Sequence, residues 1–203
     1  MQDSEINFII KKLEKVIPFI GISNEALLKT CKDLGLENAF CKFQNGIYSA
    51  LEYILEDFNH SMASELQSMD LDNIKLNERV KLAIKIHLLN YTKLKNYREF
   101  LKKVLSFFIL PQNIYFSNQM LYKISDVIWH GINDQSIDFN YYTKRVTLAG
   151  LYLSILLIFI EDHSENFIDT LSFLDRRIKN IVVFHNLKKE VKIFFSSFFN
   201  KKF

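Results

Sequence analysis

The sequence predicts an all-α fold, a bundle of about nine or ten helices. Apolar residues recur at helical spacing along nearly the whole chain, which is the pattern of amphipathic helices. The chain has 203 residues, of which 49% are hydrophobic, enough for a domain with its own core. Its five glycines and two prolines are too few for a β-rich fold with many turns, or for a glycine-rich phosphate loop.

The individual helices follow from apolar spacing and from the residues that start and end helices. The predicted helices cover about residues 5–17, 23–35, 38–42, 47–67, 77 onward, 97–108, 117–131, 138–160 and 164 to past 177, before a tail helix. The first is expected to stop at Pro18 and Gly21. Its inward face is expected to carry Phe8, Ile9, Leu13 and Val16. Three N-caps are predicted at Ser23, Asp138 and Ser164. Gly150 lies inside a predicted helix, where we expect another helix or a ligand to approach closely.

Short helices followed by longer ones are the layout of TetR-type regulators, in which the short helices form a helix-turn-helix. A recognition helix needs basic and polar side chains, whereas residues 36–43 hold one lysine and one glutamate among apolar residues. We therefore expect a degenerate helix-turn-helix-like part over 1–67 and no nucleic-acid partner. A helical core over 68–186 and an amphipathic tail helix over 187–203 complete the predicted organisation.

The positive charge gathers at the C-terminal end. Residues 176–203 hold eight basic residues and one acid, a net charge of +7, so the rest carries −4 of the total +3. Aromatic residues recur on one side of the tail with lysines at its margins, the pattern of a helix that lies in a membrane surface. The predicted membrane-binding residues are Lys188, Lys192, Phe194, Phe195, Phe198 and Phe199. The alternative is that this stripe docks on the body of the protein or on a dimer mate.

An uncharged run over residues 146–160 is shorter than the roughly 20 residues of a membrane span. We expect a helix that is buried on most sides by other helices. One stripe of it carries Leu148, Leu151, Tyr152, Ile155 and Phe159, which Phe173 could face. On the residues alone, this is an ordinary core stripe.

No catalytic motif stands out. The five histidines are scattered, and the pairs Asp57–His60 and Asp126–His130 are interpreted as surface or capping contacts. We expect no catalytic residue, no metal and no cofactor. The acids Asp3 and Glu5 argue against a secretory signal or a mitochondrial presequence, so a cytoplasmic protein is expected.

Residues 127–178 resemble the signature region of the accessory lipid-binding family of ubiquinone (coenzyme Q) biosynthesis, the Coq-nine proteins. Many of the matching residues are polar and do not follow a helical period. The matching pieces are Ile128-Trp129, Asp134-Gln135-Ser136, Asp138-Phe139-Asn140, Tyr142-Thr143-Lys144-Arg145, Leu148-Ala149, Tyr152, Asp169-Thr170 and Phe173-Leu174-Asp175-Arg176-Arg177-Ile178. The departures are Tyr141 for a common Trp, Asn133 for a usual Gly and Leu171 for an aromatic residue.

The resemblance implies a TetR-like fold without DNA binding, a dimer, and a pocket for isoprenoid quinones or phospholipids. It then assigns lipid binding to Leu148, Leu151, Tyr152, Ile155, Phe159 and Phe173. It also implies that the protein presents quinone intermediates from the membrane to the di-iron demethoxyubiquinone hydroxylase. The implied patch for that partner is Asp138, Tyr141, Tyr142 and Arg145.

The function expected is thus that of a non-enzymatic, lipid-binding accessory protein of ubiquinone biosynthesis. It is expected at the inner membrane of a bacterium, or on the matrix side of the mitochondrial membrane if the chain is eukaryotic and already processed. Two alternatives remain open: a ligand-responsive TetR-like transcriptional regulator, and a peripheral membrane scaffold without a lipid pocket.

Overall fold

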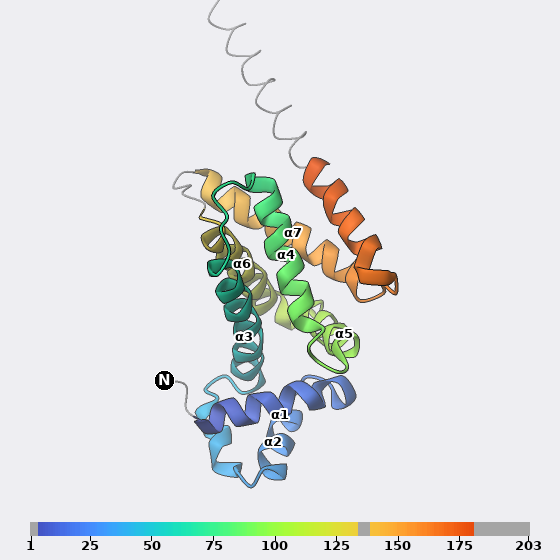
Figure 1. Ribbon diagram of the computed structural model, residues 1–203. Coiled ribbons are helices and arrows are strands. Elements are labelled where there is room, and N and C mark those ends of the chain that lie inside the picture. The colour runs from blue at the N-terminus through green and yellow to red at the C-terminus, as the bar shows by residue number, and fades with distance from the viewer. Residues whose placement is uncertain (1–3, 134–138, 181–203) are drawn as a thin grey trace, which may run out of the picture. The chain divides into compact units, whose positions relative to one another are not determined.

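The computed structural model describes residues 4–133 and 139–180, and every element within these ranges is helical, as predicted (Figure 1). A helix over 168–180 closes the described part of the chain. The other elements are α1 (Ser4–Ile20), α2 (Asn24–Asp33), the 3₁₀ helix η1 (Glu37–Lys42), α3 (Ile47–Gln67), α4 (Leu76–Tyr91), α5 (Tyr97–Phe108), the 3₁₀ helix η2 (Pro111–Asn113), α6 (Ile114–Gly131), α7 (Phe139–Phe159) and the 3₁₀ helix η3 (Glu165–Phe167). The all-α bundle is confirmed and is compatible with a TetR-like arrangement.

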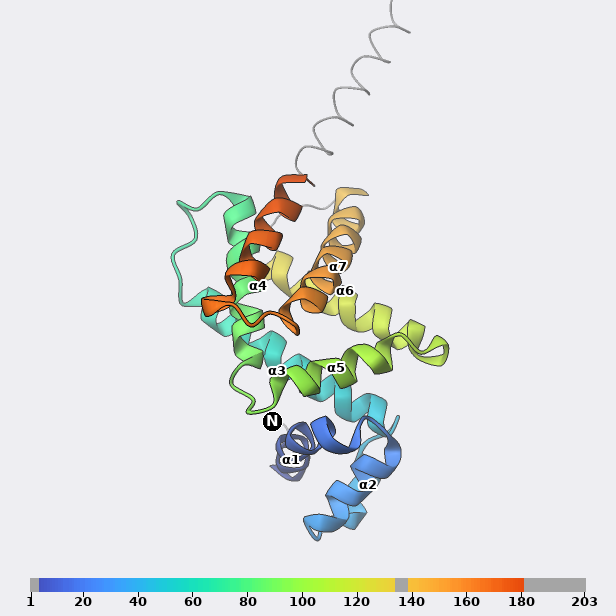
Figure 2. The same ribbon diagram turned by 90° about the vertical axis from the view of Figure 1, so that its right-hand side faces the viewer.

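The described part of the chain divides after residue 161 into two compact units. In the first, α3 packs against α4 and α6, and α7 packs against α4 and α6 (Figure 1). Leu51, Ile54 and Met62 are fully buried in this core. Helix α1 packs against α3 and α5, with α2 and η1 beside it (Figure 2). The division predicted at residues 67 and 186 differs from this one and stays a prediction.

Most helix bounds match their predictions, and α3 and α5 match at both ends. Helix α1 does not stop at Pro18 but runs to Ile20, because a proline in the last turn removes only one backbone hydrogen bond. Gly21 then ends the helix with a φ of 83°. Of the predicted inward face of α1, Ile9 and Leu13 are confirmed as buried and Val16 is half-buried, whereas Phe8 is wrong, since it is 60% exposed. The apolar side chains that α1 buries are Ile9, Ile10, Leu13, Ile17 and Pro18.

At the recognition-helix position of a helix-turn-helix, the chain forms the six-residue η1. Its Lys42 pairs with Glu5 of α1, within the protein. The connection that follows depends on Asn24, whose Oδ1 accepts a hydrogen bond from the backbone N of Ile47 at 2.8 Å. The first turn of α3 is therefore capped by a side chain from α2.

Gly46, just before α3, has no room for a side chain. Its φ is 55°, and a Cβ there would lie 2.3 Å from Asn24 Oδ1. We expect Gly46→Ala to lower the free energy of unfolding by about 2 kcal/mol, by adding backbone strain and displacing the cap. Urea unfolding followed by circular dichroism measures this loss.

Gly150 supplies the matched control. A Cβ at this position would meet no heavy atom within 4 Å, so no helix of the described part of the molecule approaches Gly150 closely, and the predicted approach of a ligand stays a prediction. Gly150→Ala is expected to raise stability by about 0.5–1 kcal/mol, through helix propensity. Equal losses in the two variants would contradict the assigned role of Gly46.

Candidate functional site

Helix α7 has apolar residues on two sides: one side packs against the bundle, and the other is exposed to solvent. The predicted stripe is buried: Leu148, Leu151, Tyr152, Ile155 and Phe159 are all at most 7% exposed. On the opposite side, Tyr142 and Val146 are each 64% exposed and Leu157 is 53% exposed. The expectation of burial on most sides is therefore wrong. By length and composition alone, Tyr141–Phe159 could cross a membrane, with 39% of that window buried.

The inward side of α7 meets a buried polar cluster. Tyr152 Oη lies 2.6 Å from His87 Nδ1, and His87 Nε2 lies 3.1 Å from Asn59 Oδ1. Tyr152 also hydrogen-bonds to Tyr91. The four side chains come from α3 (Asn59), α4 (His87 and Tyr91) and α7 (Tyr152), and none is more than 7% exposed.

The chemistry of the groups fixes the direction of these hydrogen bonds. Asn59 Oδ1 can only accept, so His87 Nε2 carries the proton and donates it. His87 Nδ1 is then the acceptor for the Tyr152 hydroxyl, whose oxygen remains to accept from Tyr91. Burial lowers the pKa of His87 to about 3 and raises the pKa of Tyr91 and Tyr152. The cluster is therefore uncharged at neutral pH. Its hydrogen bonds all run in one direction, with each group donating to the next one toward Asn59.

A small cavity opens beside this cluster. It has a volume of about 30 Å³ and is lined by Tyr152, Tyr91 and Asn59 on its polar side and by apolar residues elsewhere. A cavity of this size holds a water molecule but no larger group. Among the predicted lipid-binding residues, Tyr152 lines this inner cavity, so the lipid contacts predicted for α7 remain predictions.

A larger apolar groove lies next to the inner cavity. This outer groove, of about 190 Å³, is bordered by Ile109, Ile114, Leu153 and Leu157. The groove and the cavity have three lining residues in common: Leu105, Phe108 and Leu121. These three side chains of α5 and α6 form the wall between the two spaces. Their movement would join the surface to the polar cluster.

The groove was not predicted from the sequence, although a signal for it was present. Residues 104–122 contain no charged residue or histidine, an uncharged stretch of 19 residues. That stretch includes the end of α5, all of η2 and the start of α6. Residues 109–116 lay between the predicted helices 97–108 and 117–131 and were given no role, yet Ile109 is 77% exposed and Tyr115 is 76% exposed.

Of the three described members of the predicted partner patch, Arg145 is buried, Tyr141 is half-buried and Tyr142 is exposed. Arg145 is 2% exposed and forms an ion pair with Asp126 of α6 through its Nε. Its guanidinium lies 3.3 Å from the centre of the Tyr141 ring. Arg145 thus ties α7 to α6, whereas Tyr142 is open to a partner. Asp138 lies outside the described residues.

The two acid–histidine pairs differ. His130 Nδ1 lies 3.3 Å from Asp126 Oδ2, as expected for a surface contact. Asp57 instead pairs with Lys11 of α1, at 2.7 Å. Within residues 4–133 and 139–180, no three His, Cys, Asp or Glu side chains gather as a possible metal site.

The second unit begins with Asp162, whose carboxylate hydrogen-bonds to the first turn of the 168–180 helix. Asp162 accepts hydrogen bonds from the backbone N and hydroxyl of Ser164 at 2.8 and 2.6 Å, and from those of Thr170 at 2.8 and 2.5 Å. Burial by itself raises the pKa of Asp162, but these hydrogen bonds outweigh it and lower the pKa to about 2. Ser164 lies at the N-cap position of η3 without a side-chain cap hydrogen bond, and its Oγ instead accepts from the backbone N of Asp169, in the first turn of the 168–180 helix, at 3.1 Å.

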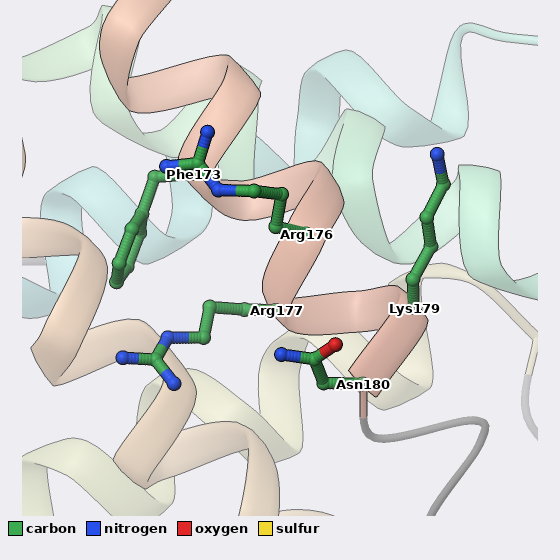
Figure 3. A pocket seen from close by; sticks show the side chains of 5 residues that line it. All are labelled: Phe173, Arg176, Arg177, Lys179 and Asn180. Carbon is green, nitrogen blue, oxygen red and sulfur yellow. The ribbon is translucent and has the colours of Figure 1, made fainter.

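Phe173, predicted to line a lipid cavity, borders a basic hollow of about 310 Å³ on the 168–180 helix. The other residues along this hollow are Arg176, Arg177, Lys179 and Asn180. Figure 3 shows Phe173 and Arg177 extending to the same side of the helix, with the guanidinium 4.9 Å from the ring centre. The predicted membrane-binding residues, all at 188 or beyond, lie outside the described residues.

Comparison with known proteins gives a consistent likeness. The COQ9 family profile matches residues 115–185. The chain is 32% identical to the ubiquinone biosynthesis protein COQ9, mitochondrial, of Rattus norvegicus over 184 residues, which are 87% of this chain and 58% of the rat protein. It is 29% identical to the proteins of the same name from Bos taurus and Homo sapiens, with 87% of this chain and 57% of each relative covered. The chain therefore spans less than two thirds of the length of these relatives.

Proposed function

Residues 115–185 of this chain carry a COQ9-family domain, and from that premise we propose that the protein serves ubiquinone biosynthesis as a non-enzymatic accessory factor. Its proposed role is to bind isoprenoid quinone intermediates and present them at a membrane. The observation that carries this proposal is the apolar outer groove between α5, α6 and α7, with the small inner cavity behind it, which has Asn59, Tyr91 and Tyr152 on one side.

The two spaces suit a molecule that is apolar over most of its length. A cavity of roughly 150 Å³ is enough for a benzene molecule, so the 190 Å³ outer groove admits a group of about that size as it stands. A longer prenyl chain requires Leu105, Phe108 and Leu121 to move aside. Covering apolar surface is worth about 25 cal/mol per Å², which favours this opening when a prenyl chain leaves a bilayer.

Leu121→Trp tests the groove directly, because the larger ring would fill the space between the outer groove and the inner cavity. We expect protein purified from a quinone-producing host to carry isoprenoid quinone, and Leu121→Trp to carry at least about tenfold less. Mass spectrometry of the extracted lipids measures this ratio. Leu89→Trp is the matched control, since Leu89 lies on α4 and is 39% exposed. A wild-type protein that carries no isoprenoid and does not bind ubiquinone-2 would overturn the proposal.

For partners, we propose the di-iron demethoxyubiquinone hydroxylase, a second copy of this chain and a membrane surface. The exposed side of α7, with Tyr142 and Val146, is the surface offered for the hydroxylase. Tyr142→Ala is the suitable probe there, because its side chain is exposed and its loss leaves the core intact. The tail at 187–203 is proposed to bind anionic membranes through its lysines and phenylalanines.

For location, we propose the matrix side of the mitochondrial inner membrane. The three relatives described above carry the word mitochondrial in their names. The expectation of a bacterial inner membrane gains no support from them.

A further inference from the structure

The residues that join α5 to α6 form an exposed apolar corner at the mouth of the outer groove. The apolar corner consists of Ile109, Leu110, Ile114 and Tyr115, which are 77, 40, 52 and 76% exposed. Ile109 and Ile114 also line the outer groove. From this placement we propose that the apolar corner dips into the hydrocarbon edge of a lipid bilayer, so that the groove opens directly into the membrane.

The charge pattern favours a bilayer over water. The corner lies within the 19 uncharged residues 104–122, and this stretch is bounded by Lys103 and Lys123. Lys123 is ion-paired with Glu52 and Glu56 of α3, so Lys103 is the basic residue that flanks the corner. Apolar side chains with a tyrosine among them, next to such a residue, match the depth profile of a membrane interface. Isolated exposed apolar residues are common on proteins, but four within seven positions of one uncharged turn form a patch.

Several backbone groups of the corner are hydrogen-bonded within the protein. The Ile109 N donates to Leu105 O at 3.1 Å, and the Asn113 N donates to Leu110 O at 2.9 Å. Asn113, which is 1% exposed, also donates from Nδ2 to Phe107 O at 2.8 Å. Since unpaired backbone groups are costly in hydrocarbon, these bonds remove the main obstacle to immersion.

Buried contacts also brace the corner from below. Tyr48 of α3 donates its hydroxyl to Asn113 Oδ1 at 2.6 Å, and its ring packs against Phe107 and Phe116 at 5.4 and 5.3 Å between centroids. Asn113 thus points inward while four apolar side chains point outward, and Gln112 is the one exposed polar side chain among them. The corner is therefore a firm apolar projection at the place where the groove begins.

The inference rests on the proposed function, because the groove is argued to take up a lipid. The test uses the full chain, with neutral phosphatidylcholine vesicles to suppress the attraction of the basic C-terminal residues. We expect Ile109→Gln combined with Ile114→Gln to weaken vesicle binding at least about tenfold. Phe8→Gln combined with Phe19→Gln is the matched control, since both side chains lie on α1 and are 60 and 72% exposed. Near-wild-type circular dichroism is expected for both double variants.

A second readout locates the corner itself. Tyr115→Trp should gain fluorescence quenching by brominated phosphatidylcholine beyond that of Trp129, which is 8% exposed. No vesicle binding, equal binding by the two double variants, or no added quenching would overturn the inference. A switch from dimer to monomer in the corner variant would overturn it too, since a second copy would then cover the corner. Titration with ubiquinone-2 in the absence of vesicles reports separately on the proposed function.

Discussion

Replacing Arg145 by methionine is expected to lower the free energy of unfolding by about 2 kcal/mol, less than for a fully buried ion pair, because the Asp126 side chain is 33% exposed. Methionine keeps the apolar stem but leaves Asp126 without its cation, and it removes the guanidinium from the Tyr141 ring. The loss of the Nη1 hydrogen bond to Tyr141 O, at 3.2 Å, adds to the effect. Urea unfolding measures the change.

The control is Lys144→Met, which removes a neighbouring cation that lies over the Trp129 ring at 4.9 Å. A partly exposed cation of this kind is worth about 0.5–1 kcal/mol. Asp126→Asn, alone and with Arg145→Met, completes a double-mutant cycle. If the two changes are additive, the ion pair does not stabilise the contact between α6 and α7.

Replacing Asp162 by alanine is expected to cost about 3 kcal/mol, because four donors from Ser164 and Thr170 lose a charged acceptor together. The pKa of Asp162 in the folded protein is about 2, below its ordinary value of 3.8. A lowered pKa stabilises the fold at pH values above 4, and this contribution is lost as the pH falls from about 4 to 2. The wild-type protein should therefore lose stability in that window, and Asp162→Ala should lose less of its remaining stability there.

Asp169→Ala is the comparison for this prediction, since Asp169 lies in the same turn with an exposed side chain. It should change stability by less than about 1 kcal/mol, the usual limit for an exposed charge near a helix N-terminus. Chemical unfolding from pH 2 to pH 7 separates the two variants. Parallel acid profiles for wild type and Asp162→Ala would show that another carboxylate governs the low-pH loss.

Local sequence patterns were enough to predict the helices, because the spacing of apolar residues and the residues that end helices both act within one segment. The bounds of α3 and α5 follow from such signals. Phe8 was misplaced because its apolar character does not decide which side of α1 packs against the bundle. Asp162 was missed although Ser164 was predicted as a cap, since the partner Thr170 lies eight positions away across a turn with Asn166 at a φ of 53°.

The site was harder to predict because it depends on tertiary packing. Asn59, His87 and Tyr152 lie on three helices, and no spacing along the chain brings them together. Tyr152 was selected through the family resemblance and does line the inner cavity. Leu153 and Leu157 of α7 border the outer groove. They lie beside the predicted stripe on this helix and were not included in it.

Photolabelling with a prenyl quinone that carries a diazirine in its chain tests the central claim most directly, by locating the bound lipid. The expected result is label on peptides from α5, α6 and α7, near Leu105, Leu121 and Leu153, with loss of label when ubiquinone-2 competes. Label confined to residues 1–67, or label that ubiquinone-2 does not displace, would contradict an isoprenoid site between these helices.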